Sequence, residues 1–164
     1  ELLDPGGEFY PVDYRDSVAA RKAAAQFPNW LTEGLPDYLA QVVAARTGFP
    51  EGDVFAIGGL TKVDSVCAAR LSASKRRDEI LDRVGRSGRL EALFTTERAE
   101  VAPAYYACSQ SFTKYVVAKA GLPSVVGVFP QIPSGKWVHS LETAAGITLE
   151  RMRESWLADV VHAQ

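Results

Sequence analysis

The segment PAYYACSQSFTKYVVAKAG, residues 103–121, carries the clearest helix signals in this chain of 164 residues. Pro103 suits a first helical position, because the N–H that proline lacks would be unpaired there anyway. Gly121 suits the end of a helix, and Pro123 follows two residues later. We therefore predict that the longest helix begins at Pro103, runs to Lys119 and closes at Gly121.

Three further helices are expected after this segment. A short one covers residues 124–129 and precedes a loop at 130–135, and the next covers residues 137–145 and ends at Gly146. Thr148 is expected to cap the last helix. Its apolar residues recur at helical spacing and should face the core: Leu149, Met152, Trp156, Leu157 and Val160.

Two helices are expected in the N-terminal part of the chain. One covers residues 13–26 and stops before Pro28. The other covers residues 30–46, and Pro36 should lie in its first turn, so the regular part is expected to start near Leu35. One apolar stripe marks this second helix: Leu31, Leu35, Tyr38, Leu39, Val42 and Val43.

The middle of the chain is harder to interpret. Residues 51–63 form either a short strand or a buried loop, after which Asp64 or Ser65 is expected to cap a helix. Residues 72–84 are highly charged, which is typical of a solvated helix face; a basic surface that binds a partner is the alternative. A helical turn is expected at residues 90–95. The sum is a mainly α fold, with at most a minor extended element, in a single domain of residues 1–164 whose residues 1–12 form an extended arm.

Composition excludes several classes of protein. The chain is 47% hydrophobic and 23% charged, and its net charge is −2. Non-specific binding to nucleic acid or to an anionic membrane needs a basic face, so neither is expected. No apolar run reaches the roughly 20 residues of a membrane span, and no signal peptide is visible. The compartment is not fixed by this, although a secreted or cell-envelope location is favoured over the cytoplasm; the oligomeric state is open.

The chain has two cysteines, Cys67 and Cys108. They could pair as a disulfide if the protein is exported, or remain two buried thiols if it is not. Two lone cysteines do not make a zinc-binding spacing.

Three segments of the chain together resemble segments of one known protein family. FPNWLTEGLPDY, residues 27–38, resembles the "Pro-x-Trp-Leu-x-Glu-Gly-Leu-Ala-x-Tyr" segment of the peptidase MA-like, gluzincin-type zinc metallopeptidases, with Pro36 in place of the alanine. YYACSQSF, residues 105–112, is similar to the "Tyr-Ala-x-Ser" helix of that family. LETAAGITLE, residues 141–150, followed by Trp156, resembles the family's C-terminal segment. The resemblance covers residues 12–157, and residues 48–98 match poorly, as an insertion would.

The resemblance implies a helical domain around a zinc site. In such enzymes two histidines of a His-Glu-x-x-His motif and a downstream glutamate hold the metal, and the glutamate inside the motif accepts a proton from zinc-bound water. The resemblance puts Glu33 at the downstream ligand position. The preceding segment contains no histidine; if the motif falls on residues 13–17, Asp13 and Ser17 replace the ligands and Tyr14 replaces the base.

The two histidines, His139 and His162, match no ligand position of the family and are interpreted as ordinary surface residues. Glu33 is either an orphaned zinc ligand, part of a rebuilt site with Asp13 or Asp16, or a carboxylate that interacts favourably with the start of a helix. Carboxylates without imidazole suit calcium or magnesium better than zinc. Tyr106 corresponds to the family tyrosine, which could donate to an oxyanion, but a core position is the simpler interpretation.

Three functions remain open. The first is a degenerate metallopeptidase-like domain that does not hydrolyse with zinc and binds a peptide, protein or small ligand in the former active-site cleft. The second is an enzyme with zinc-independent acid/base chemistry that uses Glu33, Asp13, Asp16 and Tyr106. The third is an incomplete or processed part of an active peptidase whose histidine ligands lie outside this chain.

Overall fold

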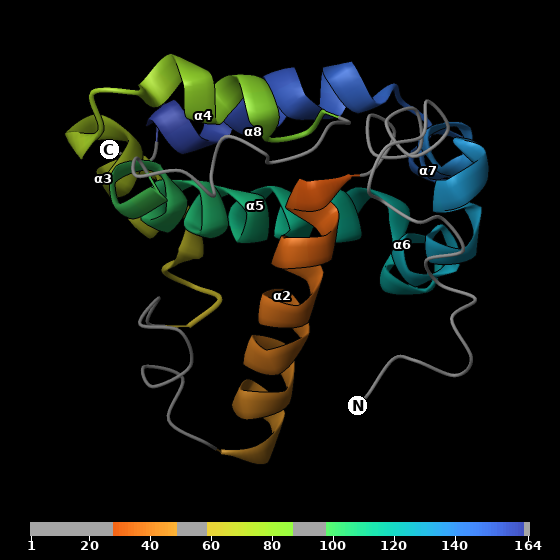
Figure 1. Ribbon diagram of the computed structural model, residues 1–164. Helices are drawn as coiled ribbons and strands as arrows, with labels where there is room; N and C mark the ends of the chain where they lie inside the picture. The colour runs from red at the N-terminus through yellow and green to blue at the C-terminus, as the bar shows by residue number, and fades with distance from the viewer. Residues whose placement is uncertain (1–27, 49–58, 87–97, 163–164) are drawn as a thin grey trace, which may run out of the picture.

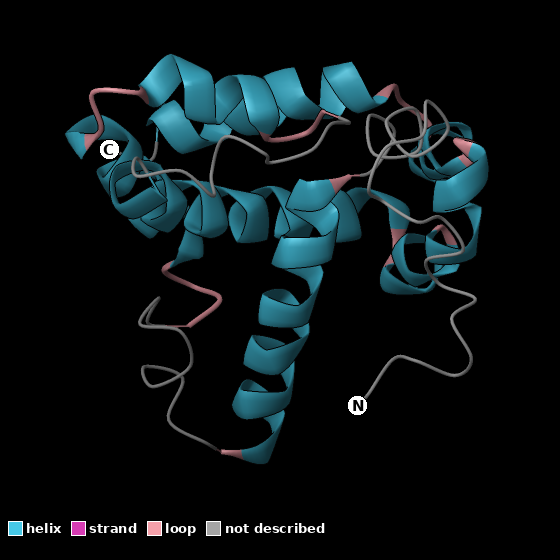
Figure 2. Cartoon of the chain, in the orientation of Figure 1, coloured by secondary structure: helices cyan, strands magenta, loops and turns pink. Residues whose placement is uncertain are grey.

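A computed structural model describes residues 28–48, 59–86 and 98–162 of the chain. The regular elements of these ranges are all helices (Figure 2), which confirms the mainly α prediction. In chain order they are α2 (Asn29–Thr47), α3 (Val63–Ala73), α4 (Arg77–Arg83), α5 (Arg98–Ala120), α6 (Leu122–Gly127), the 3-10 helix η3 (Phe129–Ser134), α7 (Trp137–Ala145) and α8 (Leu149–His162). Within the described ranges, no helix is both long and apolar enough to cross a membrane.

The long helix α5 is the centre of the structure. It contacts α2, α3, α4, α6, α7 and α8. In Figure 1, α4 and α8 lie along one side of α5, whereas α2 crosses α5 steeply and extends away from them. Buried residues therefore occur around most of its circumference. The apolar ones include Ala104, Tyr105, Cys108, Phe112 and Val116, and the polar ones are Ser109, Gln110, Ser111 and Thr113.

Proline did not mark the helix starts that we predicted. α5 begins at Arg98, so Pro103 is its sixth residue, and α2 begins at Asn29, so Pro36 lies well inside it. Both prolines are exposed. A proline inside a helix removes one backbone hydrogen bond and strains the preceding turn. Here Leu35, Ala102 and Ala104 beside the two prolines are buried, and the packing of such residues outweighs that cost.

The apolar stripe of α2 is only partly correct. Leu31 and Leu35 are buried, but Val43 is 57% exposed, and Gln41 is buried instead. The C-terminal part of α2 extends away from the helices that cover its first turns (Figure 1), so hydrophobic periodicity does not translate into burial there.

The predicted caps of α3 are wrong. Lys62 occupies the position before the helix, and the side chain there makes no capping hydrogen bond. Asp64 lies inside the first turn and pairs across the structure, whereas the Ser65 hydroxyl donates to the carbonyl of Lys62. A carboxylate in the first turn still interacts favourably with the helix dipole.

The charged stretch at residues 72–84 contains the end of α3 and the short α4. Glu79 pairs with both Arg76 and Arg83 within α4 and its preceding residue. Ile80 is buried and attaches α4 to the core. Much of the charge is therefore neutralised locally on a solvated face, as the simpler interpretation expected.

The C-terminal third follows the sequence prediction closely. α7 has the predicted bounds, with Gly146 in the left-handed conformation after it. The Thr148 hydroxyl accepts a hydrogen bond from the Arg151 N–H at 3.2 Å, which confirms the predicted cap of α8. Glu142 adds a second cap from α7, because its carboxylate accepts the Leu149 N–H at 2.9 Å. The short helix expected at residues 124–129 is shifted: α6 ends at Gly127, and η3 occupies much of the expected loop.

A disulfide and a chain of aromatic rings hold the core together. Cys67 of α3 and Cys108 of α5 are bonded, with their Cα atoms 4.8 Å apart, so the alternative of two buried thiols is wrong. Phe112 lies between Trp30 and Trp156, with ring centroids 4.7 and 5.1 Å apart, and Trp30 also contacts Trp137 at 6.5 Å. Tilted aromatic pairs at such distances are favourable beyond the area that they bury.

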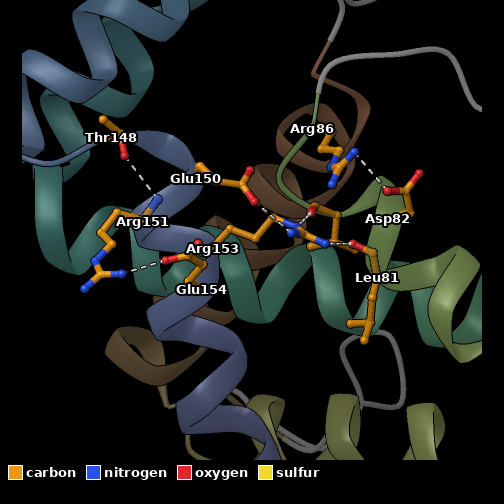
Figure 3. A network of polar contacts seen from close by, with 9 residues as sticks. Leu81, Asp82, Arg86, Thr148, Glu150, Arg151, Arg153 and Glu154 are labelled. Carbon is orange, nitrogen blue, oxygen red and sulfur yellow. Dashed lines mark hydrogen bonds and ion pairs between the residues drawn. The ribbon is translucent and has the colours of Figure 1, made fainter.

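Arg153 joins α8 to the end of α4 (Figure 3). Its buried guanidinium donates to the carbonyl oxygens of Val84 at 2.9 Å and Leu81 at 2.6 Å, and it pairs with Glu150 at 3.3 Å. These carbonyls lie at the C-terminal end of α4, where the last carbonyl groups of a helix have no N–H of a following turn to accept from. A Cβ added to Gly85 would lie 2.9 Å from both Arg153 Cδ and Phe112 Cε1, and Gly85 has φ +82°, so glycine is required at this turn.

Several predicted elements fall outside the described ranges. These are the extended arm at residues 1–12, the helix at 13–26, the helical turn at 90–95 and most of the stretch at 51–63.

Candidate functional site

The predicted site residues are only partly described. Glu33 lies on α2 and Tyr106 on α5, and both are half-buried. Asp13 and Asp16 lie outside the described residues. The site can therefore be built from the crossing of α2 with α5, the most extensive helix contact in the described part of the chain.

Gly34, the residue after Glu33, allows this crossing. A Cβ at Gly34 would overlap Thr113 Oγ1 and would lie 2.5 Å from the carbonyl oxygen of Ser109. Such a distance is far below van der Waals contact, so any larger residue would push the two helices apart. Gly34 of the first motif therefore lets the backbone of α2 lie directly against α5. Glu33, the preceding residue, is positioned next to this contact.

Tyr105, which the sequence reasoning did not select, interacts electrostatically with Glu33. The Tyr105 side chain is 1% exposed, and burial raises the pKa of its phenol well above the ordinary range. The Glu33 carboxylate and Tyr106 raise the pKa further, whereas Ser109 and Arg83 lower it. The phenol is therefore protonated at neutral pH, and its side chain is part of the hydrophobic core. The neighbouring Tyr106 is half-buried, with its ring centroid 6.0 Å from that of Tyr105 in an edge-to-face arrangement.

The described groups around Glu33 do not fit zinc. The Tyr105 phenol interacts electrostatically with Glu33, whereas zinc sites use imidazole, thiolate and carboxylate groups. His139 is exposed on α7, and His162 is the last residue of α8. In the described ranges, no three or more His, Cys, Asp or Glu residues are grouped so that they could hold a metal ion.

The three segments that carry the metallopeptidase resemblance meet in one core. Trp30 of the first segment packs on Phe112 of the second, and Phe112 packs on Trp156 of the third. The Trp156 indole N–H also donates to Ser111 Oγ at 2.9 Å. Residues far apart along the chain thus form a single chain of contacts, as the members of one domain core do.

The sequence reasoning missed a second polar centre on another face of α5. Asp64 accepts hydrogen bonds from Ser111 Oγ and from Lys114 Nζ, both at 2.6 Å. Beside this group lies a pocket of about 190 Å³, which we call the α3–α5–α8 pocket. Its lining residues include Asp64, Ser111, Lys114, Tyr115, Trp156 and Asp159.

Little in the sequence could have revealed this centre. Asp64 lies 47 and 50 residues from its partners Ser111 and Lys114, and no local pattern predicts a pairing at that range. The one available signal was the spacing of Ser111, Lys114, Tyr115 and Ala118, which puts them on one face of a helix.

Comparisons with known protein families, with curated proteins and with solved structures find no match to this chain. The site therefore has to be interpreted from its own residues.

Proposed function

We propose that this chain is a degenerate metallopeptidase-like helical domain that does not hydrolyse peptides with zinc. In this proposal it binds a peptide, protein or small ligand beside Glu33, in the place where the resembled enzymes hold their metal. The observation that carries the proposal is the close crossing of α2 and α5 at Gly34, beside which Glu33 is half-buried and interacts with the phenol of Tyr105.

The packing supports the relationship on which the proposal rests. The three resembling segments share one aromatic core, through the rings of Trp30, Phe112 and Trp156. The disulfide between Cys67 and Cys108 supports a location in an oxidising compartment, where such bonds form and persist. A secreted or cell-envelope role in binding is therefore part of the proposal.

The first test is metal content together with hydrolysis. The disulfide-bonded protein is incubated with zinc chloride, freed of unbound metal and analysed for zinc, and the same preparation is assayed on fluorescently labelled casein. We expect no stoichiometric zinc and no cleavage. One bound zinc per chain, with cleavage that is lost in Glu33→Gln but kept in Glu154→Gln, would refute the proposal. Glu154 is an exposed carboxylate on α8, so it controls for the loss of charge alone.

The second test is binding. A mixture of short peptides from a casein digest is titrated into the protein, and backbone amide NMR signals are followed. We expect the shifts to concentrate on Glu33, Tyr105 and Tyr106, and to weaken in Glu33→Gln. If zinc binding and cleavage appear only when the chain is expressed with its flanking coding sequence, the incomplete-peptidase alternative replaces this proposal.

A further inference from the structure

The α3–α5–α8 pocket is built from one face of each of two helices and the start of a third. Ser111, Lys114 and Tyr115 come from α5, Trp156 and Asp159 come from α8, and Asp64 comes from the first turn of α3. The pocket is separate from the crossing of α2 with α5, so a ligand bound in it would not depend on the function proposed for Glu33.

Hydrogen bonds hold one end of the pocket rigid. The Trp156 indole N–H donates to Ser111 Oγ at 2.9 Å, the Ser111 hydroxyl donates to Asp64 Oδ1 at 2.6 Å, and Lys114 Nζ donates to Asp64 Oδ2 at 2.6 Å. Ser111 is 1% exposed and both of its hydrogen-bonding roles are used, so it is a positioning residue and not a nucleophile. Each group in this chain has a partner, and the corner is therefore pre-organised.

The charges of the lining favour a cation. The charged lining residues are two carboxylates, Asp64 and Asp159, and one ammonium, that of Lys114, so the lining itself carries one negative formal charge. Asp64 is already paired with Lys114. Asp159 is exposed on α8 and has no ion-pair partner among the residues that the structure describes. It is the charge that remains for a ligand.

The apolar part of the lining suits an organic cation more than a metal ion. Tyr115 is half-buried and presents its aromatic ring, and rings of this kind attract ammonium groups over their faces. Trp156 is 1% exposed and forms the buried wall of the pocket. The Lys119 ammonium already lies 5.2 Å from the centroid of the Tyr115 ring, so the ammonium of a ligand is assigned to Asp159 and only its apolar stem to this ring. Drug-sized ligands occupy pockets of roughly 300–1,000 Å³. The volume of about 190 Å³ is smaller, and it matches a single side chain or a small metabolite.

We propose that the α3–α5–α8 pocket binds an alkylammonium group on a short apolar stem, with the ammonium at Asp159 and the stem against Trp156 and Tyr115. The group could belong to a free small amine or to a lysine side chain of a partner protein, because both present the same chemistry.

The test uses a series of ligands with one shape and different charge. Benzylammonium, benzyl alcohol and phenylacetate are titrated separately while the Trp156 indole and Tyr115 backbone amide signals are followed by NMR. We expect saturable shifts with benzylammonium, and binding weaker by roughly fivefold or more with the neutral and anionic probes, as the loss of one partly exposed ion pair predicts. Equal binding of all three probes would overturn the proposal.

Two variants locate the interaction. Asp159→Asn should weaken benzylammonium binding by roughly fivefold, whereas Asp78→Asn, an exposed carboxylate on α4, should leave it unchanged. Ala118→Trp should block the pocket, because Ala118 lines it and is exposed enough for the protein to fold; Ala144→Trp on α7 is the matched control. Unchanged affinity in Asp159→Asn or in Ala118→Trp would refute the site.

The source of the ammonium is distinguished by a parallel titration. Nα-acetyl-lysine amide represents a partner's side chain, and Nα-acetyl-norleucine amide is its uncharged match. Tighter binding of the lysine derivative than of benzylammonium indicates a protein partner, and the reverse indicates a free amine. Binding of neither cation overturns the proposal.

Discussion

The two sides of α5 differ in whether their buried polar groups have hydrogen-bond partners. On the side of α3 and α8, the Trp156 indole, the Ser111 hydroxyl and the Asp64 carboxylate form a continuous hydrogen-bonded chain. At the crossing with α2, Thr113 Oγ1 is buried against Gly34 and has no hydrogen-bond partner among the described residues. The side-chain amide of Gln110 and the indole N–H of Trp30 are also buried and also have no hydrogen-bond partner among the described residues.

This difference indicates what each side contributes. A satisfied polar chain stabilises and fixes a single arrangement, whereas an unsatisfied buried group costs free energy and is tolerated only where packing or function outweighs the cost. The crossing with α2 is held by close approach of backbones and by aromatic packing. The side of α3 and α8 is held by a disulfide and directed hydrogen bonds. Substitutions on the two sides should therefore change the free energy of unfolding by different amounts, and deletion of a buried hydroxyl should differ in sign between them.

The largest effect is expected on the side of α3 and α8. Replacing both Cys67 and Cys108 with alanine removes a cross-link between residues 41 apart in sequence. Chain entropy predicts a loss of about 4 kcal/mol in the free energy of unfolding for a loop of this length. Urea unfolding monitored by circular dichroism measures it. A loss below about 1 kcal/mol would show that hydrogen bonds and packing alone hold α3 to α5.

The next effect is expected at the crossing with α2. Gly34→Ala introduces a Cβ only 2.5 Å from a backbone carbonyl, which cannot move as a flexible side chain could. We expect a loss of about 3 kcal/mol from overpacking, measured by thermal and urea unfolding. Gly127→Ala is the matched control, because its added Cβ meets nothing within 4 Å. That variant should be neutral or slightly stabilised, and equal losses in the two would contradict the close crossing.

A pair of hydroxyl deletions compares the two sides directly. Ser111→Ala leaves the buried Trp156 N–H without its acceptor and should cost about 2 kcal/mol. Thr113→Val removes a hydroxyl that has no partner among the described residues, so it should cost nothing and could stabilise by about 1 kcal/mol. Both are read from urea unfolding midpoints at an unchanged slope. Equal effects in the two variants would remove the distinction between the two sides.

The smallest effect concerns Asp37 on α2. Burial raises the pKa of this carboxyl above its ordinary value of 3.8. The folded state therefore binds the proton more tightly than the unfolded state, and the free energy of unfolding falls as pH rises through the raised pKa. At pH 7, Asp37→Asn should stabilise by a few tenths of a kcal/mol, because a half-exposed carboxyl is well screened.

The stabilisation by Asp37→Asn should vanish below pH 3.8, where the carboxyl is protonated in both states. Asp78→Asn should have the opposite sign at neutral pH, since it removes a favourable charge from the first turn of α4. Stability curves from acidic to neutral pH for the wild type and both variants make the comparison.

Much of the C-terminal third could be predicted from sequence. The bounds of α7, the end at Gly146 and the cap at Thr148 depend on neighbouring residues, and local hydrogen bonds decide them. The predicted helix at residues 30–46 matches α2 to within one residue at each end, but the expectation that Pro36 lies in its first turn was wrong, as was the predicted start of α5 at Pro103. Pro36 and Pro103 have strong local preferences, but tertiary packing on both flanks extends the helix through them.

The two candidate sites also differ in whether they could be predicted from sequence. Glu33 was selected because its motif is contiguous in the chain, and the structure adds Tyr105 as the phenol that interacts with it. The α3–α5–α8 pocket was not predicted, because its charged residues come from three helices separated by tens of residues. Asp64 was one of two candidate helix caps, with Ser65, and instead its carboxylate pairs with Lys114, which lies 50 positions further along the chain.

The sequence by itself determined the helical class, most of the helix identities and the absence of two histidines one helical turn apart, because periodicity, capping and residue type are local properties. Only the tertiary structure decided that Cys67 meets Cys108, that Gly34 is pressed against Ser109, and that Asp64 faces Lys114 beside a pocket. Those pairings depend on how whole helices pack around α5, and packing is set by the summed burial of many residues rather than by any one segment.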